Sequence, residues 1–132
     1  MSNSIKNIVD NIEINNLKKK VINNKKIFEI VEKFIKNKKL ILYGGYALNL
    51  ILPKNKKIYR DYTSADFDCY SYSAKIDAIQ LAKKLKKMNY SLIKVKLAKH
   101  ENTYKLYVGT LNVLDITQLD KKIFDIFIKI HN

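Results

Sequence analysis

The sequence predicts an α/β fold of the α+β kind, organised as one compact unit. Two patterns predict it: short runs rich in β-branched and aromatic residues, and stretches whose apolar residues recur with the period of a helix. The length of 132 residues and the apolar fraction of 47% allow one modest core and exclude a globally disordered chain.

The first part of the chain, residues 1–38, is expected to be a helical segment that precedes a core spanning 39–132. Apolar residues between Ser4 and Ile12 follow helical spacing, which predicts a short helix. The same rhythm runs from Leu17 to Lys36 with an interruption near Asn23 and Asn24. This second stretch is expected to be one long helix or two shorter ones.

A buried strand is predicted at 40–43, where four apolar residues precede the Gly44-Gly45 pair. Residues 46–52 are expected to form a short helix that Pro53 closes. A polar loop is predicted to follow over 54–64.

Side chains of two kinds alternate along residues 65–72. This alternation predicts a strand that places Asp66, Asp68 and Tyr70 on one face. Ser73 is expected to cap the next helix. The inner stripe of that helix is predicted to consist of Ile76, Ile79, Ala82 and Leu85.

Three further strands are predicted at 90–97, 103–108 and 111–117, the last two joined by a hairpin turn at Gly109-Thr110. The final stretch, 119–130, has a helical period and is apolar on nearly every side. A helix of this kind is normally buried against another element, which indicates truncation of a longer protein or an oligomer interface.

The charge is strongly basic, with 26 Lys and Arg residues against 12 Asp and Glu and a net charge of +14. Such an excess favours nucleic acid or nucleotide partners. Biased coding of an AT-rich gene would also produce a chain so rich in Lys, Asn and Ile. The single cysteine, Cys69, excludes an internal disulfide and is expected to be a core thiol. No signal peptide or membrane-spanning segment is recognisable, so no membrane partner is expected.

Three features are candidates for chemistry: the Gly44-Gly45 turn, the Asp66-x-Asp68 pair, and Asp115 inside an apolar strand. Glycines let the backbone approach a phosphate, although a plain tight turn would look the same. The paired acids lie about 7 Å apart along their strand and repel each other unless a cation compensates them. A solvated strand face is the alternative for that pair, but Asp115 would be costly to bury without a partner.

Carboxylate oxygens suit Mg²⁺, and three of them on neighbouring strands are able to hold two ions as in nucleotidyl transfer. Asp66, Asp68 and Asp115 are therefore predicted as metal ligands and catalytic residues. Gly44 and Gly45 are predicted to contact the nucleotide.

The order of these motifs resembles the polymerase-β-like nucleotidyltransferase superfamily. More narrowly, residues 40–120 resemble the poly(A) polymerase catalytic subunits of giant and other large DNA viruses. The motifs that carry the resemblance are LYGGYALN at 42–49, ADFDCYS at 65–71, AKH at 98–100 with TYK at 103–105, and VLDIT at 113–117.

The resemblance implies a nucleotidyltransferase palm with a mixed, mostly antiparallel sheet flanked by helices. It also implies that the chain adds AMP from ATP to RNA 3′ ends with Mg²⁺ or Mn²⁺, two ions in all. In this family the D-x-D acids bind the metals and the third Asp activates the RNA 3′-hydroxyl, roles that would fall to Asp66, Asp68 and Asp115. Triphosphate contact would fall to Gly44 and Gly45. The family's polymerases continue into further domains, so additional C-terminal domains or a processivity partner are expected.

Two other functions remain open at the level of sequence. One is a minimal nucleotidyltransferase that modifies a protein or a small molecule. The other is a non-catalytic, basic RNA-binding subunit or a fragment of a polymerase. The expected location is cytoplasmic, in the virion or the host cytoplasm for a viral protein.

Overall fold

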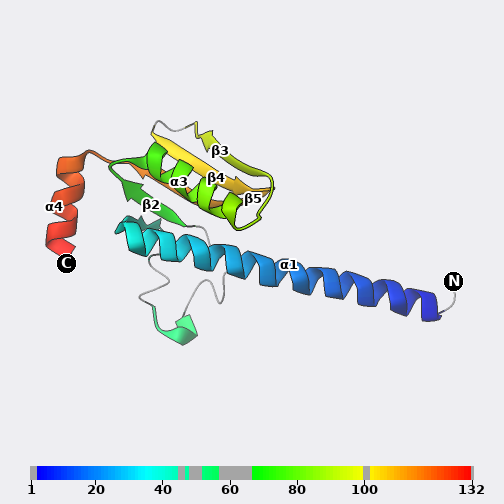
Figure 1. Cartoon of the computed structure of the whole chain (residues 1–132). Coiled ribbons are helices and arrows are strands. Elements are labelled where there is room, and N and C mark those ends of the chain that lie inside the picture. The colour runs from blue at the N-terminus through cyan, green and yellow to red at the C-terminus, as the bar shows by residue number, and fades with distance from the viewer. Residues whose placement is uncertain (1–2, 45–46, 48–51, 57–66, 100–101, 132) are drawn as a thin grey trace.

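The computed structural model describes residues 3–44, 47, 52–56, 67–99 and 102–131. Its centre is a five-stranded sheet in the order β1-β2-β5-β4-β3. The strands are β1 Ile41–Tyr43, β2 Asp68–Ser71, β3 Ile93–Leu97, β4 Thr103–Val108 and β5 Leu111–Gln118. Only β2 and β5 run parallel, while the other three neighbouring pairs are antiparallel. The predicted mixed, mostly antiparallel sheet flanked by helices is therefore confirmed (Figure 1).

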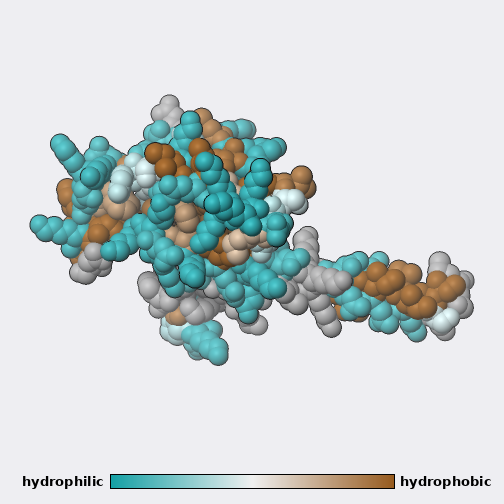
Figure 2. Space-filling view, viewed as in Figure 1, coloured by the Kyte–Doolittle hydropathy of each residue, from teal (hydrophilic) through white to brown (hydrophobic). Residues whose placement is uncertain are grey.

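The helix α1, Asn3–Lys38, is continuous, so the expectation of a separate short helix at its start was wrong. Asn23 and Asn24 lie within it, because asparagine weakens a helix but does not break it as proline does. The C-terminal half packs against the core through residues at helical spacing, namely Ile27, Phe28, Val31, Phe34 and Ile35. The N-terminal half extends away from the sheet and exposes apolar side chains such as Ile8 and Ile12 (Figures 1 and 2).

The helix α3, Ala74–Lys87, packs on the same core as α1. Its buried residues include Ala74, Ala78, Leu81 and Leu85, so the predicted inner stripe is correct at Leu85 but wrong at Ile76, which is 59% exposed, and at Ile79. The two alanines let the helix approach the sheet closely, which turns the larger isoleucines outward. Ser73 precedes the helix but its hydroxyl makes no cap hydrogen bond.

The predicted hairpin is confirmed, because Gly109 turns with a φ of +63° between β4 and β5. The predicted strand 90–97 begins only at Ile93, since Leu92 before it has a left-handed φ of +57°. A 3-10 turn, Lys54–Lys56, occupies part of the predicted polar loop. Most of the predicted helix over 46–52 and the rest of that loop lie outside the described residues.

The last helix, α4 Lys121–His131, packs through Phe124, whose ring meets Tyr72 edge-on at 5.1 Å between centroids. Ile123, Ile126 and Ile130 are exposed, so most of its apolar side has no cover among the residues described. Across the described part of the chain, no helix is both long and apolar enough to cross a membrane.

Candidate active site

Two of the predicted acids lie side by side on the sheet. Asp68 and Asp115 are register partners across the parallel strands β2 and β5, and the next pair, Cys69 and Ile116, is buried in the core. Since side chains alternate along a strand, both carboxylates project from the face opposite the core. The side chain of Asp115 is only 14% exposed. The structure thus brings together two acids that are far apart in the sequence.

Gly44 lies against one of these acids at the end of β1. Its φ is +79°, a conformation that L residues rarely adopt, and a Cβ atom placed there would lie 2.8 Å from Oδ2 of Asp68. The neighbouring Tyr43 is the register partner of Asp68. Glycine at position 44 therefore lets the main chain approach the carboxylate more closely than any other residue would.

Asp115 has two polar partners that were not among the predicted site residues. Lys105 Nζ donates to Oδ2 at 2.9 Å, and Asn112 Nδ2 donates to Oδ1 at 2.9 Å. Lys105 is the register partner of Asp115 on β4. The signal in the sequence was weak: a single lysine in the alternating run 103–108 becomes informative only when the strand pairing is known.

Tyr43 reaches over β2 to β5. Its ring stacks on that of Tyr70 with centroids 4.2 Å apart, and its hydroxyl lies 3.2 Å from Oγ1 of Thr117. Burial raises the pKa of the Tyr43 phenol, the hydrogen bond with Thr117 lowers it, and the negative charge of Asp68 raises it further. The phenol therefore remains protonated at neutral pH and forms a polar, uncharged wall beside the acids.

A buried polar cluster supports β2 from the core side. Asp77 of α3 is 5% exposed and accepts hydrogen bonds from the hydroxyls of Ser71, at 2.5 Å, and Ser73, at 3.2 Å. Lys38 Nζ, at the end of α1, lies 3.7 Å from Oδ1 of Asp77. This cluster joins β2, α3 and α1 directly behind the strand that carries Asp68.

Cys69 is buried, as predicted for a core thiol. Burial is the main cause that raises the pKa of its thiol, and the negative charges of Asp77, Asp68 and Asp115 raise it further. The thiol is therefore poorly suited to be a nucleophile.

The remaining predicted site residues, Asp66 and Gly45, lie outside the described residues. Within the residues that are described, no group of three His, Cys, Asp or Glu side chains forms a metal cluster. The two adjacent carboxylates, with Gly44 leaving space beside one of them, nevertheless fit hard divalent cations such as Mg²⁺ by their donor chemistry.

Comparison with known proteins places the chain in a family. Residues 29–132 match the family model of the poly(A) polymerase catalytic subunit. Over 87 residues, the chain is 34% identical to a protein of Acanthamoeba polyphaga mimivirus that is assigned as a poly(A) polymerase catalytic subunit, a match that covers 63% of this chain. The crystal structure of the Megavirus polyadenylate synthase superposes with a TM-score of 0.74 at 25% identity over 95% of this chain.

The chain spans 15% of the length of the mimivirus protein and 28% of the Megavirus chain. The family match, by contrast, includes every described site residue from Gly44 to Thr117. The chain belongs to the poly(A) polymerase catalytic subunit family.

Proposed function

We propose that this chain is the catalytic portion of a nucleotidyltransferase that adds AMP from ATP to the 3′ ends of RNA. The observation that carries the proposal is the pairing of Asp68 with Asp115 on adjacent strands, with the Gly44 main chain against Asp68. Asp66, two residues before Asp68, would complete the set of three acids. The family and the structural relative support the same reaction.

The three acids would hold two Mg²⁺ or Mn²⁺ ions. When bound, such ions lower the pKa of an attacking hydroxyl and stabilise the charge of the displaced phosphate. Gly44 and Gly45 would let the triphosphate approach the main chain, because neither presents a side chain. Lys105 compensates the charge of Asp115 and holds its carboxylate in one orientation.

The transfer forms a bond between the RNA 3′-oxygen and the α-phosphorus of ATP. The bond from that phosphorus to the oxygen bridging to the β-phosphorus breaks, and pyrophosphate leaves. The proton of the 3′-hydroxyl passes to the Asp115 carboxylate and then to water. Positioned proton acceptors of this kind typically contribute about 10²–10⁴-fold to a rate.

Incorporation of labelled nucleotide from each NTP onto a short oligo(A) primer tests the proposal. We expect incorporation from ATP with Mg²⁺ or Mn²⁺, and a loss of at least about a hundredfold in Asp68→Asn and in Asp115→Asn. Asp125→Asn is the matched control, because it removes an equal charge from an exposed position on α4.

Equal incorporation by the three variants would overturn the site assignment. A second assay uses a fusion of this chain to the segments that its longer relatives have outside the matched region. Absence of incorporation by this folded fusion would overturn the proposed reaction. Transfer to a protein or small molecule instead would support the minimal nucleotidyltransferase. RNA binding without any transfer would support a non-catalytic subunit.

A further inference from the structure

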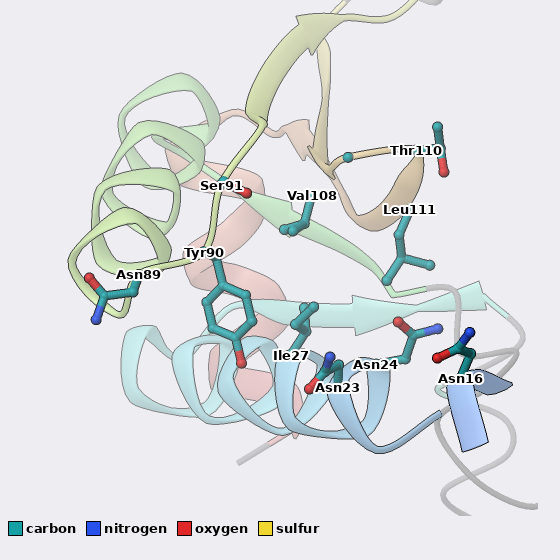
Figure 3. Close-up of a pocket in the computed structure, with 11 residues that line it drawn as sticks. Asn16, Asn23, Asn24, Ile27, Asn89, Tyr90, Ser91, Val108, Thr110 and Leu111 are labelled. Carbon is teal, nitrogen blue, oxygen red and sulfur yellow. The ribbon is translucent and has the colours of Figure 1, made fainter. Parts of the chain in front are cut away.

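A hollow of about 670 Å³ with a mixed polar and apolar lining lies away from the acids, where α1, the α3–β3 turn and the β4–β5 turn meet (Figure 3). Its size falls within the range of small-molecule sites. Side-chain amides and hydroxyls dominate its polar lining, contributed by Asn16, Asn23, Asn24, Asn89, Ser91 and Thr110.

Tyr90 is the common wall of this hollow and two smaller ones. The first, of about 300 Å³, lies towards Lys26 and Lys33 of α1. The second, of about 420 Å³, lies towards Lys86 and Leu92. The three adjoin at Tyr90, and we call them together the Tyr90 groove. Among the residues whose side chains the structure describes, Glu29 is the one acidic residue that lines it, against three lysines.

The turn that carries Tyr90 is conformationally strained. Asn89 and Leu92 have φ angles of +69° and +57°. A left-handed asparagine is common at the end of a helix, but a left-handed leucine is unusual, and Leu92 is also 79% exposed. Its carbonyl accepts a hydrogen bond from Gly109 N at 2.9 Å, which fixes this turn to the β4–β5 turn. Strain of this kind concentrates where a ligand is held.

These features match the chemistry of single-stranded RNA. Aromatic rings stack on bases, asparagine amides pair with base edges, and lysines contact phosphates. We propose that the Tyr90 groove binds the part of a single-stranded RNA that lies upstream of its 3′ end. This inference rests on the proposed function for the identity of the RNA as substrate.

The groove is a separate site from the acids. Leu111, which lines it, precedes Asp115 by four residues on β5, a separation of about 14 Å along the strand. Ile27, also in the lining, belongs to the helix layer that covers the face opposite the acids. The path from the acids to the groove is therefore at least about 14 Å long and leads to the other face of the sheet, so an RNA must be long enough to pass around the sheet to occupy both sites.

Fluorescence anisotropy of labelled oligo(A) in two lengths tests the groove without requiring catalysis. The variant Lys26→Ala/Lys86→Ala removes two exposed lysines of the groove. Lys122→Ala/Lys129→Ala is the control with equal charge change on exposed positions of α4. Both pairs lie within helices, where alanine is well tolerated.

For the long RNA, we expect the groove variant to bind about tenfold more weakly than the control. The slope of log affinity against log salt should be shallower by about 1.4, since each lysine–phosphate contact on a single strand contributes about 0.7. Binding of the short RNA should equal that of the control.

Tyr90→Leu provides a second test that keeps an apolar side chain in place. We expect about tenfold weaker binding of the long RNA, the scale of one lost stacking contact. Because Tyr90 also packs against the core, binding is measured below the melting temperature of the variant. In the parent, photo-crosslinking of a long RNA carrying 4-thiouridine upstream should label the peptide that contains Tyr90.

Long-RNA binding equal to that of the control in both groove variants would overturn the proposal. A crosslink found only outside the groove would also overturn the proposal. Because binding and crosslinking are measured with Asp68→Asn as well as the parent, a failure of AMP transfer does not obscure either result.

Discussion

Lys105 and Asp115 form an ion pair in which Nζ lies 2.9 Å from Oδ2 on adjacent strands of the sheet. The positive charge of Lys105 already compensates the negative charge of Asp115, one of the acids to which a divalent cation would bind. Lys105 thus has two opposing effects: it stabilises an otherwise costly, mostly buried carboxylate, and it competes with a metal ion for the same charge.

Replacing Lys105 by methionine should strengthen metal binding, because the removal of a nearby positive charge favours a cation. We expect the affinity for Mn²⁺ to rise by at least about tenfold, measured by electron paramagnetic resonance of the free ion. Lys122→Met on α4 is the control. Unchanged affinity in the Lys105 variant would show that Asp115 does not contribute to the metal site.

A comparison of Gly44→Ala with Gly109→Ala should distinguish the effect of backbone strain from the effect of a new contact between the alanine Cβ and Asp68. Both glycines have positive φ, so each substitution should cost about 1–2 kcal/mol in the free energy of unfolding. Only the Cβ at 44 would meet Asp68, whereas the Cβ at 109 would have no atom of the described structure within 4 Å. We expect a large loss of incorporation on a short primer for Gly44→Ala alone. Similar losses in both variants would contradict a special role for Gly44.

Asp77→Ala should destabilise the fold, because it leaves the buried hydroxyl of Ser71 without its acceptor. We expect the free energy of unfolding to fall by about 2 kcal/mol, measured by urea denaturation. Asp125→Ala, at an exposed position, should change it by less than about 0.5 kcal/mol. A small effect at Asp77 would indicate that the cluster behind β2 relaxes readily.

Tyr43 should make stability fall at high pH. Since burial raises its pKa in the folded state above the ordinary value of 10.0, the unfolded chain releases this proton first. The contribution is fully present below about pH 10 and is lost as the pH rises through the folded pKa. Urea denaturation across this range should show a steeper decline for the parent than for Tyr43→Phe. Parallel declines would contradict the raised pKa.

Several elements could be predicted because their signals are local. The spacing of Phe28, Val31 and Ile35 marks the buried face of α1, and the alternation over 68–71 separates Asp68 from Cys69. The hairpin at Gly109 depends only on turn chemistry. The pattern failed for α3, where Ile76 fits the helical stripe as well as Ala78 does, and only packing against the sheet selects the alanine.

By itself, the sequence determined the mixed fold, the order of the strands along the chain and the acids that carry the proposed chemistry. These follow from periodicity, turn residues and motif order, all of which act over a few residues. Only the tertiary structure decided that Asp68 faces Asp115, that Lys105 pairs with it, and that Tyr90 joins three hollows. The reason is that strand register and the docking of turns depend on contacts between segments far apart in the chain, and local patterns do not encode which segments meet.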